Sequence, residues 1–156
     1  MALREAMLYE PLSENRVRCD LCGRRCIVPE GSVGFCRVRK NEGGRLYSLV
    51  YGKACSAQVD PITKKPLSHF HPGSLVMSIA TVGCNFRCKF CDNWMISQER
   101  EIRGYDLPPE RVVQAAKDNG CQGISYTYTE PTIFFEYAYD TAQLAHKEGI
   151  FNTFVT

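Results

Sequence analysis

The sequence lacks any apolar run near the ~18 residues that a membrane-spanning helix needs. Its first ten residues, MALREAMLYE, include acidic side chains and no apolar core, so they do not resemble a secretory signal. We therefore expect a cytoplasmic protein with no membrane partner. The ferredoxin run C-x2-C-x2-C-x3-C-P is also missing, and no cysteine precedes a proline. This absence weighs against iron–sulfur clusters bound in the ferredoxin manner.

Cysteine, by contrast, is abundant: nine occur in 156 residues, mostly at short spacings. An odd number of cysteines without a signal peptide argues against a secreted disulfide scaffold. Metal sites built from thiolates in a reducing compartment explain the clustering better. The apolar fraction of 44% and the charged fraction of 23% are those of an ordinary globular domain.

Three cysteines form the pattern C-x3-C-x2-C directly after the mostly apolar run 74–82, namely Cys84, Cys88 and Cys91. An iron–sulfur cube normally takes four cysteine ligands, one per iron, so three ligands leave one iron open. An open metal position is where a substrate or cosubstrate binds. The pattern therefore predicts a reactive cluster rather than a simple electron carrier.

Four further cysteines form C-x2-C-x3-C-x9-C near the N-terminus, namely Cys19, Cys22, Cys26 and Cys36. Four thiolates within eighteen residues favour a closed tetrahedral zinc site that holds together a lobe too small for its own core. An auxiliary iron–sulfur cluster is the alternative, because four cysteines can bind either metal.

Charge is unevenly distributed along the chain. Residues 1–72 hold 12 Lys and Arg against 7 Asp and Glu, whereas residues 73–156 hold 7 against 10. A basic lobe can attract nucleic acid, but Phe35 is the only aromatic residue in the basic cluster around the four cysteines. We therefore expect a solvated basic face and treat nucleic-acid binding as a minor hypothesis.

The second half alternates predicted strands and helices. Strands are predicted over 74–82, 123–129 and 150–156, and helices over 106–120 and 131–147. This order is typical of a βα repeat with a parallel sheet. The fold class is therefore α/β. We expect two domains: a Cys-rich lobe with short strands over residues 1–72, and βα units over residues 73–156.

The run GCNFRCKFCDNWMISQ, with DPITKKPLSHFHPGS before it and GISYTYTEPT after it, resembles a known family. It looks like radical S-adenosylmethionine (radical SAM) enzymes, and within them the AmmeMemoRadiSam system, a relative of the pyruvate formate-lyase activating enzymes. The resemblance implies the first part of a TIM-like partial (β/α)6 barrel. Because the sequence stops inside a strand pattern, it looks like an N-terminal portion of a longer enzyme.

The resemblance also implies a chemistry. Cys84, Cys88 and Cys91 would bind a [4Fe–4S] cluster whose open iron holds S-adenosylmethionine. An electron from an external donor would cleave that cosubstrate into methionine and a 5′-deoxyadenosyl radical, which takes a hydrogen atom from a substrate. In the activating-enzyme relatives, that hydrogen comes from a glycine Cα of a partner protein.

Four cofactor contacts follow from the same resemblance. Phe90 would flank the adenine, and Tyr128, Thr129 and Glu130 occupy the place of the family's Gly-Gly-Glu motif near the methionine amino group. Both glycines are replaced here. The structural alternative to these cofactor contacts is that Phe90 packs under its loop and that Thr129 and Glu130 cap the following helix.

Two other functions remain open from the residues alone. An electron-transfer protein with two clusters would need a fourth ligand for the first cluster, such as Cys55 or Cys121. A zinc-dependent module that binds RNA or a partner would be centred on residues 19–40.

Overall fold

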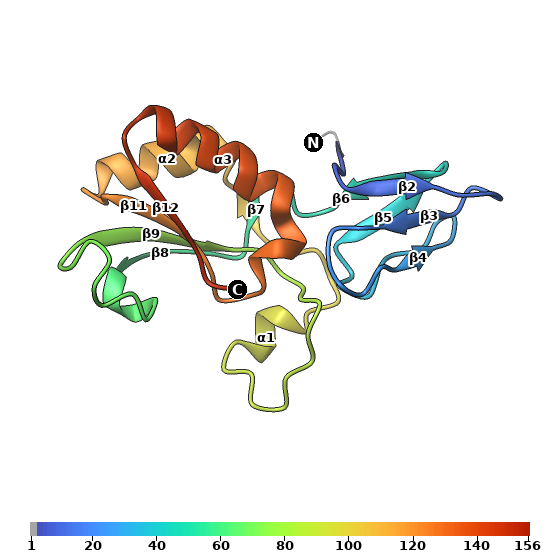
Figure 1. Cartoon of the computed structure of the whole chain (residues 1–156), viewed down its shortest axis with the longest axis horizontal. Coiled ribbons are helices and arrows are strands. Elements are labelled where there is room, and N and C mark those ends of the chain that lie inside the picture. The colour runs from blue at the N-terminus through green and yellow to red at the C-terminus, as the bar shows by residue number, and fades with distance from the viewer. Residues whose placement is uncertain (1–2) are drawn as a thin grey trace.

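The computed structural model describes residues 3–156, which form a mixed α/β fold (Figure 1). Its largest sheet has the strand order β12-β11-β9-β8. The strands β9 (Leu75–Ala80), β11 (Gly123–Tyr126) and β12 (Phe151–Phe154) run parallel, as the βα pattern predicts. The strand β8 (Ser56–Pro61) joins the sheet antiparallel to β9 and covers the β9 edge of the three parallel strands.

Two helices pack together on one face of this sheet, α2 (Pro109–Asp118) and α3 (Phe135–Lys147) (Figure 1). The 3-10 turn η2 (Pro131–Phe134) leads into α3. The helix α2 begins later than the predicted residue 106, because Pro108 has an extended backbone at the N-cap. The predicted order of strands and helices is thus confirmed.

Within residues 3–156 the sheet does not close into a barrel. Three parallel strands and one antiparallel strand make an open, four-stranded layer. The finer expectation, a portion of a (β/α)6 barrel, therefore stays a prediction.

The remaining elements are short. Two three-stranded sheets have the orders β1-β6-β5 and β2-β3-β4, and β7 pairs with β10. Their bounds, with those of the two smallest helical elements, are β1 Arg4–Glu5, β2 Tyr9–Pro11, β3 Val17–Cys19, β4 Ile27–Val28, β5 Arg39–Glu42, β6 Arg45–Ser48, β7 Lys53–Ala54, η1 Ile62–Lys64, α1 Trp94–Ser97 and β10 Tyr105–Asp106.

The described residues, 3–156, form one large apolar core and one small one. The large core lies between the main sheet and its helices, and it also takes in Cys36, Val38 and Val50 from the N-terminal part. The small core contains only five buried side chains, those of Ala6, Val17, Cys19, Val28 and Leu46. No helix in the described part of the chain combines the length and apolarity that crossing a membrane would require.

Candidate functional site

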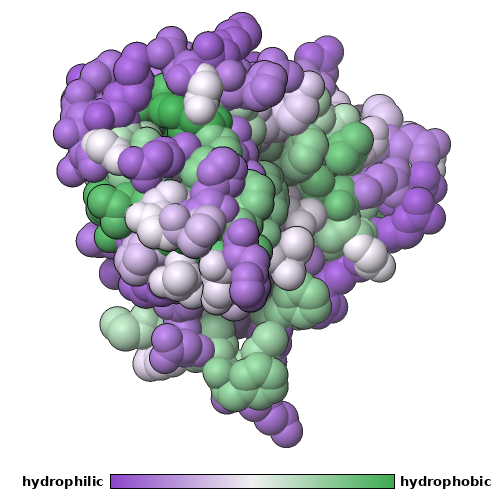
Figure 2. All heavy atoms as spheres, turned by 60° about the vertical axis from the view of Figure 1, so that its left-hand side comes forward, coloured by the Kyte–Doolittle hydropathy of each residue, from purple (hydrophilic) through white to green (hydrophobic). Residues whose placement is uncertain are grey.

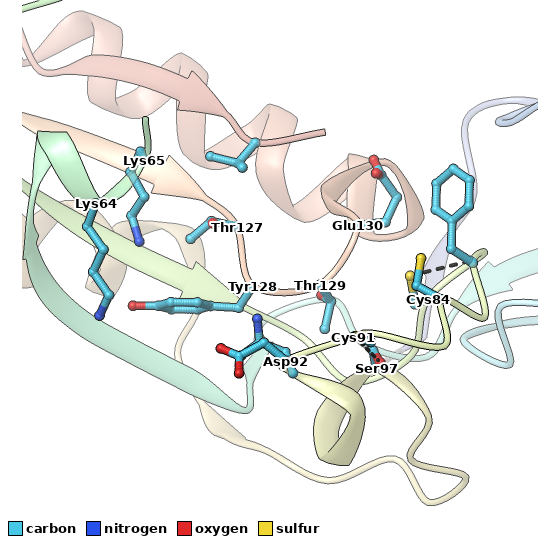
Figure 3. A pocket seen from close by; sticks show the side chains of 14 residues that line it. Lys64, Lys65, Cys84, Cys91, Asp92, Ser97, Thr127, Tyr128, Thr129 and Glu130 are labelled. Atoms are coloured by element: carbon cyan, nitrogen blue, oxygen red, sulfur yellow. Dashed lines mark hydrogen bonds between the residues drawn. The ribbon is translucent and has the colours of Figure 1, made fainter. Parts of the chain in front are cut away.

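A cavity of about 570 Å³ opens at the carboxyl ends of the three parallel strands (Figure 3). In parallel α/β sheets this is the edge where ligands bind. The lining comes from the loops that follow β9, β11 and β12 and from the segment after β8. It consists of Lys64, Lys65, Cys84, Phe86, Cys88, Cys91, Asp92, Asn93, Ser97, Thr127, Tyr128, Thr129, Glu130 and Val155.

The structure brings Cys84, Cys88 and Cys91 to this one cavity. Cys84 is buried, Cys91 is half-buried and Cys88 is exposed. The loop leaves β9 at Gly83, whose φ of +89° few other residues adopt. Cys91 Sγ lies 3.3 Å from the Ser97 hydroxyl, and the Phe86 amide donates to Cys84 Sγ at 3.4 Å.

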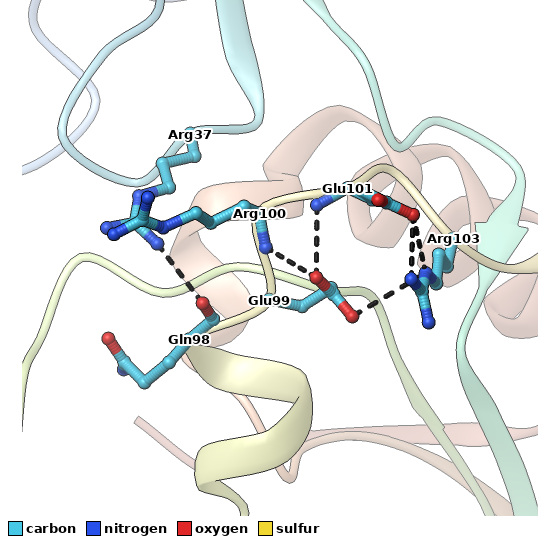
Figure 4. Close-up of polar contacts among 6 residues, drawn as sticks. All are labelled: Arg37, Gln98, Glu99, Arg100, Glu101 and Arg103. Carbon is cyan, nitrogen blue, oxygen red and sulfur yellow. Dashed lines mark hydrogen bonds and ion pairs between the residues drawn. The ribbon is translucent and has the colours of Figure 1, made fainter.

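The segment that follows α1 is tied to the N-terminal part of the chain (Figure 4). The Arg37 guanidinium donates to the Gln98 carbonyl at 3.1 Å. The Glu99 carboxylate accepts the next backbone amides, those of Arg100 at 2.7 Å and Glu101 at 3.1 Å. The Arg37 bond holds the end of the cysteine loop against the N-terminal part, and the Glu99 bonds shape the turn that follows.

Phe90 lies outside the cavity lining, and its side chain is 90% exposed. The reading in which it packs under the loop is therefore wrong. It belongs to a group of exposed apolar side chains on the loop and on α1, which also includes Phe86, Trp94 and Met95. Figure 2 shows hydrophobic atoms on the projection at the bottom of the molecule, where Figure 1 has α1 and the loop before it.

The predicted contacts Tyr128, Thr129 and Glu130 all line the cavity. Thr129 Oγ1 donates to the Thr81 carbonyl at 2.9 Å, which joins this segment to the end of β9. Glu130 is the N-cap of η2, because its carboxylate accepts the Thr132 amide at 3.1 Å. Glu130 therefore both caps η2 and lines the cavity.

Sequence reasoning missed the two lysines that line the far side of the cavity. Lys64 Nζ and Lys65 Nζ lie 2.8 and 2.7 Å from the two carboxylate oxygens of Asp60, which also accepts the Tyr128 hydroxyl. Burial raises the Asp60 pKa, but these hydrogen bonds outweigh it and hold the pKa well below its usual range. The signal was present in the motif DPITKKPL, which carries all three charged residues.

A second, much smaller pocket brings Cys19, Cys22, Cys26 and Cys36 together. It has a volume of about 20 Å³, little more than the ~10–15 Å³ that one water needs. Without a ligand, burial raises the pKa of the Cys36 thiol to about 11.

Arg39 lines this small pocket and is 1% exposed. Its two terminal nitrogens donate to the Glu136 carboxylate at 2.7 and 2.8 Å, whereas its Nε is buried with no partner among residues 3–156. A buried donor without a partner is costly, so it marks a place for an acceptor. A cluster of metal-bound thiolates beside Arg39 would offer both acceptors and negative charge.

The two cysteine sites share a wall. Asn85, the neighbour of Cys84, lines the small pocket, and its backbone carbonyl accepts Arg24 Nε at 2.5 Å. A Cβ atom on Gly83 would lie 2.7 Å from the Cys36 carbonyl oxygen, so the two chain segments are in direct backbone contact.

Within residues 3–156, no group of three or more Cys, His, Asp or Glu side chains is arranged to hold a single metal ion as it stands. A cube with one thiolate per iron does not need its ligands around one ion. The tetrahedral site does need that, so its four thiols must move closer together to bind zinc. Both metal assignments remain predictions.

The other cysteines lie elsewhere. Cys121 is buried in the large core and Cys55 packs against it, and neither lines either cysteine pocket. Burial raises the pKa of both thiols, that of Cys55 to about 11. Both thiols therefore pack in or against the core, away from the two cysteine pockets.

Comparison with known proteins places the chain in a family. The family described as the radical SAM superfamily matches residues 78–156. The chain is 52% identical to the uncharacterized protein MJ0808 of Methanocaldococcus jannaschii over 99% of its length, and 30% identical to the uncharacterized protein MJ0674 of that organism over 64%.

The matches cover 47% and 26% of those two proteins, so the chain spans about half, or less, of the length of these relatives. No solved structure matches the chain. The superfamily match extends over half of the sequence and includes the second half of β9, the three-cysteine loop, the strands β11 and β12, and both long helices. The chain therefore belongs to the radical SAM superfamily.

Proposed function

We propose that the chain is part of a radical SAM enzyme in which Cys84, Cys88 and Cys91 hold a [4Fe–4S] cluster and the large cavity receives S-adenosylmethionine. The observation that supports this most is that the three thiols and the segment Tyr128–Thr129–Glu130 line the same cavity. They come from loops after different strands, about forty residues apart in sequence. Their proximity therefore arises from the tertiary fold and is not contained in the three-cysteine motif.

When bound, the reduced cluster would supply the electron that splits the sulfonium of S-adenosylmethionine and yields a 5′-deoxyadenosyl radical for hydrogen abstraction. The chain's own share is to bind and orient. Glu130 Oε1 accepts bonds from Thr132 and from the Thr156 hydroxyl, and Oε2 keeps capacity for an ammonium hydrogen bond. Thr129, fixed to the end of β9, keeps this backbone beside the cysteine loop.

The finer assignments of the whole protein form part of the same proposal. The subgroup is the AmmeMemoRadiSam system, related to pyruvate formate-lyase activating enzymes. The fold is a partial (β/α)6 barrel, with the Cys-rich lobe over 1–72 and the first βα units over 73–156. An external electron donor and a separate substrate, a protein in the activating-enzyme relatives, complete the reaction. Phe90 is proposed to flank the adenine, although it is exposed and lies outside the cavity lining.

For Cys19, Cys22, Cys26 and Cys36 we propose structural zinc. The pocket of about 20 Å³ has room for one ion but not for a cube, and the unpaired Arg39 Nε suits a dianionic four-thiolate site. An auxiliary iron–sulfur cluster would have to displace the pocket walls.

The alternatives have less support. A two-cluster electron carrier would need a fourth ligand at the cavity, and neither Cys55 nor Cys121 lines it. An RNA-binding module would use Phe35 for stacking. However, the guanidinium carbons of Arg24 and Arg87 lie 3.5 and 4.3 Å from the Phe35 ring centroid, so its ring is already in contact with cations.

The test is to count iron and sulfide in anaerobically reconstituted protein. Replacing Cys84, Cys88 and Cys91 together by Ala should remove the four irons and four sulfides per chain, while Cys121→Ala and Cys55→Ala should retain them. The [4Fe–4S]⁺ EPR signal of the unaltered chain should change when S-adenosylmethionine is added. Loss of the cluster in a single Cys121 or Cys55 variant would favour the electron carrier instead.

A further inference from the structure

At one end of the large cavity, the two positive charges of Lys64 and Lys65 face the single negative charge of Asp60. Lys64 and Lys65 each make one hydrogen bond to Asp60, and within residues 3–156 no other protein acceptor pairs with either. An ammonium group has three N–H donors, so each lysine keeps two. Two ammonium groups beside the single carboxylate of Asp60 also leave one positive charge at this end of the cavity, whereas the other charged lining residues, Asp92 and Glu130, are acidic.

These donors are held in place. The Lys65 side chain is 2% exposed and its Nζ lies 4.3 Å from the Tyr128 ring centroid. Tyr128 donates its hydroxyl to Asp60 and has a φ of +65°, a backbone conformation that non-glycine residues adopt infrequently. Figure 3 shows the Tyr128 ring extending from the cavity toward the two lysines, away from Cys84.

The sheet beside this cluster has a polar face. Ser78, Ser125 and Thr153 are register neighbours on three parallel strands, and each is buried with a hydroxyl that has no partner among residues 3–156. Ser78 lies near Asp60 and Tyr128 but makes no hydrogen bond of acceptable geometry. Side chains alternate along a strand, so Ser125 and Thr153 share their face with Thr127 and Val155, which line the cavity.

We propose that this end of the cavity, formed by Lys64, Lys65 and Tyr128, is the subsite for an anionic group of the substrate, a carboxylate or a phosphate. Fixed ammonium donors suit an anion and not an apolar group. The assignment to the substrate rests on the proposed function. There, the open iron would hold S-adenosylmethionine at the cysteine end, and the ammonium and sulfonium groups of that cosubstrate would be repelled by the lysines.

The experiment titrates inorganic phosphate and succinate, in parallel, into the anaerobically reconstituted chain by isothermal titration calorimetry at low salt. Lys64→Gln should weaken binding by about 10–100-fold, because one charge-assisted hydrogen bond is lost. Lys64 is suitable because its side chain is 57% exposed, so its replacement spares the buried pair of Asp60 and Lys65. The matched control is Lys117→Gln, a lysine 48% exposed and paired with Glu148 outside the cavity, which should bind as the unaltered chain does.

Binding of phosphate alone would support a phosphorylated substrate, and binding of succinate alone a carboxylate. Binding of neither, or equal binding by Lys64→Gln and the unaltered chain, would overturn the subsite. Loss of anion binding at saturating S-adenosylmethionine would assign this end to the cosubstrate and overturn the substrate assignment. The same titration on metal-free chain separates this inference from the proposed function, since it needs neither the cluster nor the cosubstrate.

Discussion

At the scale of single residues, buried charges connect parts of the chain that are far apart in sequence. Arg39 and Glu136 are 97 residues apart, yet they form a bidentate pair with side chains 2% and 0% exposed. Burial alone would raise the Glu136 pKa, but the Arg39 guanidinium outweighs it and lowers the pKa. The pair joins the four-cysteine pocket to helix α3.

Arg39→Met should lower the free energy of unfolding by about 3–5 kcal/mol, because it leaves the Glu136 carboxylate buried without its counter-ion. Urea denaturation would measure it. Lys117→Met, which breaks an exposed pair, should cost under ~1 kcal/mol. A double variant, Arg39→Met with Glu136→Leu, should recover part of the loss. Equal losses for Arg39→Met and Lys117→Met would contradict the role of the buried pair.

Asp60 makes the free energy of unfolding depend on pH: the folded state loses stability as the pH falls. Its pKa is lower in the folded protein than in the unfolded chain, so its contribution is complete above the unfolded value of about 3.9 and is lost as pH falls toward the folded value. Asp60→Asn should therefore cost about 2–4 kcal/mol at pH 7 and pH 5, and less at pH 3.5.

Urea unfolding of both proteins at these three pH values provides the check. Asp118→Asn serves as the control, because Asp118 is exposed and accepts only one neutral hydrogen bond, from Gln114. A difference between Asp60→Asn and the unaltered chain that stays constant down to pH 3.5 would contradict the assignment.

At the scale of elements, the main question is how the cysteine loop is placed. It begins at Gly83, where an added Cβ would lie 2.6 Å from a Val38 methyl carbon and 2.7 Å from the Cys36 carbonyl oxygen. The backbone of the N-terminal part and that of the loop therefore touch, and only glycine permits that contact.

Gly83→Ala should cost about 2–5 kcal/mol, the sum of a strained positive φ and a displaced neighbouring backbone. Gly120→Ala is the matched control. Gly120 also has a positive φ, but nothing lies within 4 Å of the added Cβ, so the expected cost is only about 1–2 kcal/mol. We also expect Gly83→Ala to bind less iron per chain than Gly120→Ala after reconstitution. Equal values for the two variants would show that the contact is unimportant.

At the scale of the whole molecule, the small N-terminal core has far fewer buried side chains than the large core. Five buried side chains cannot stabilise two three-stranded sheets alone, so we expect a metal to contribute to folding. Purified protein should contain one zinc, and its removal by a chelator should lower Tm by on the order of 10 °C. A Cys22→Ser and Cys26→Ser double variant should show a low Tm that the chelator does not change. A chelator-insensitive Tm in zinc-loaded, unaltered protein would contradict this.

The sequence by itself determined the order of strands and helices in the second half, because each segment has its own periodicity and its own proline or glycine boundaries. It also determined the two cysteine groups, because metal-ligand spacing is a local property. The tertiary structure alone decided that β8 pairs with β9, that Lys64 and Lys65 reach the cavity beside Tyr128, and that the two cysteine sites share a wall at Gly83 and Asn85. These contacts join residues distant in the chain, and they depend on how whole elements pack, which no local pattern encodes.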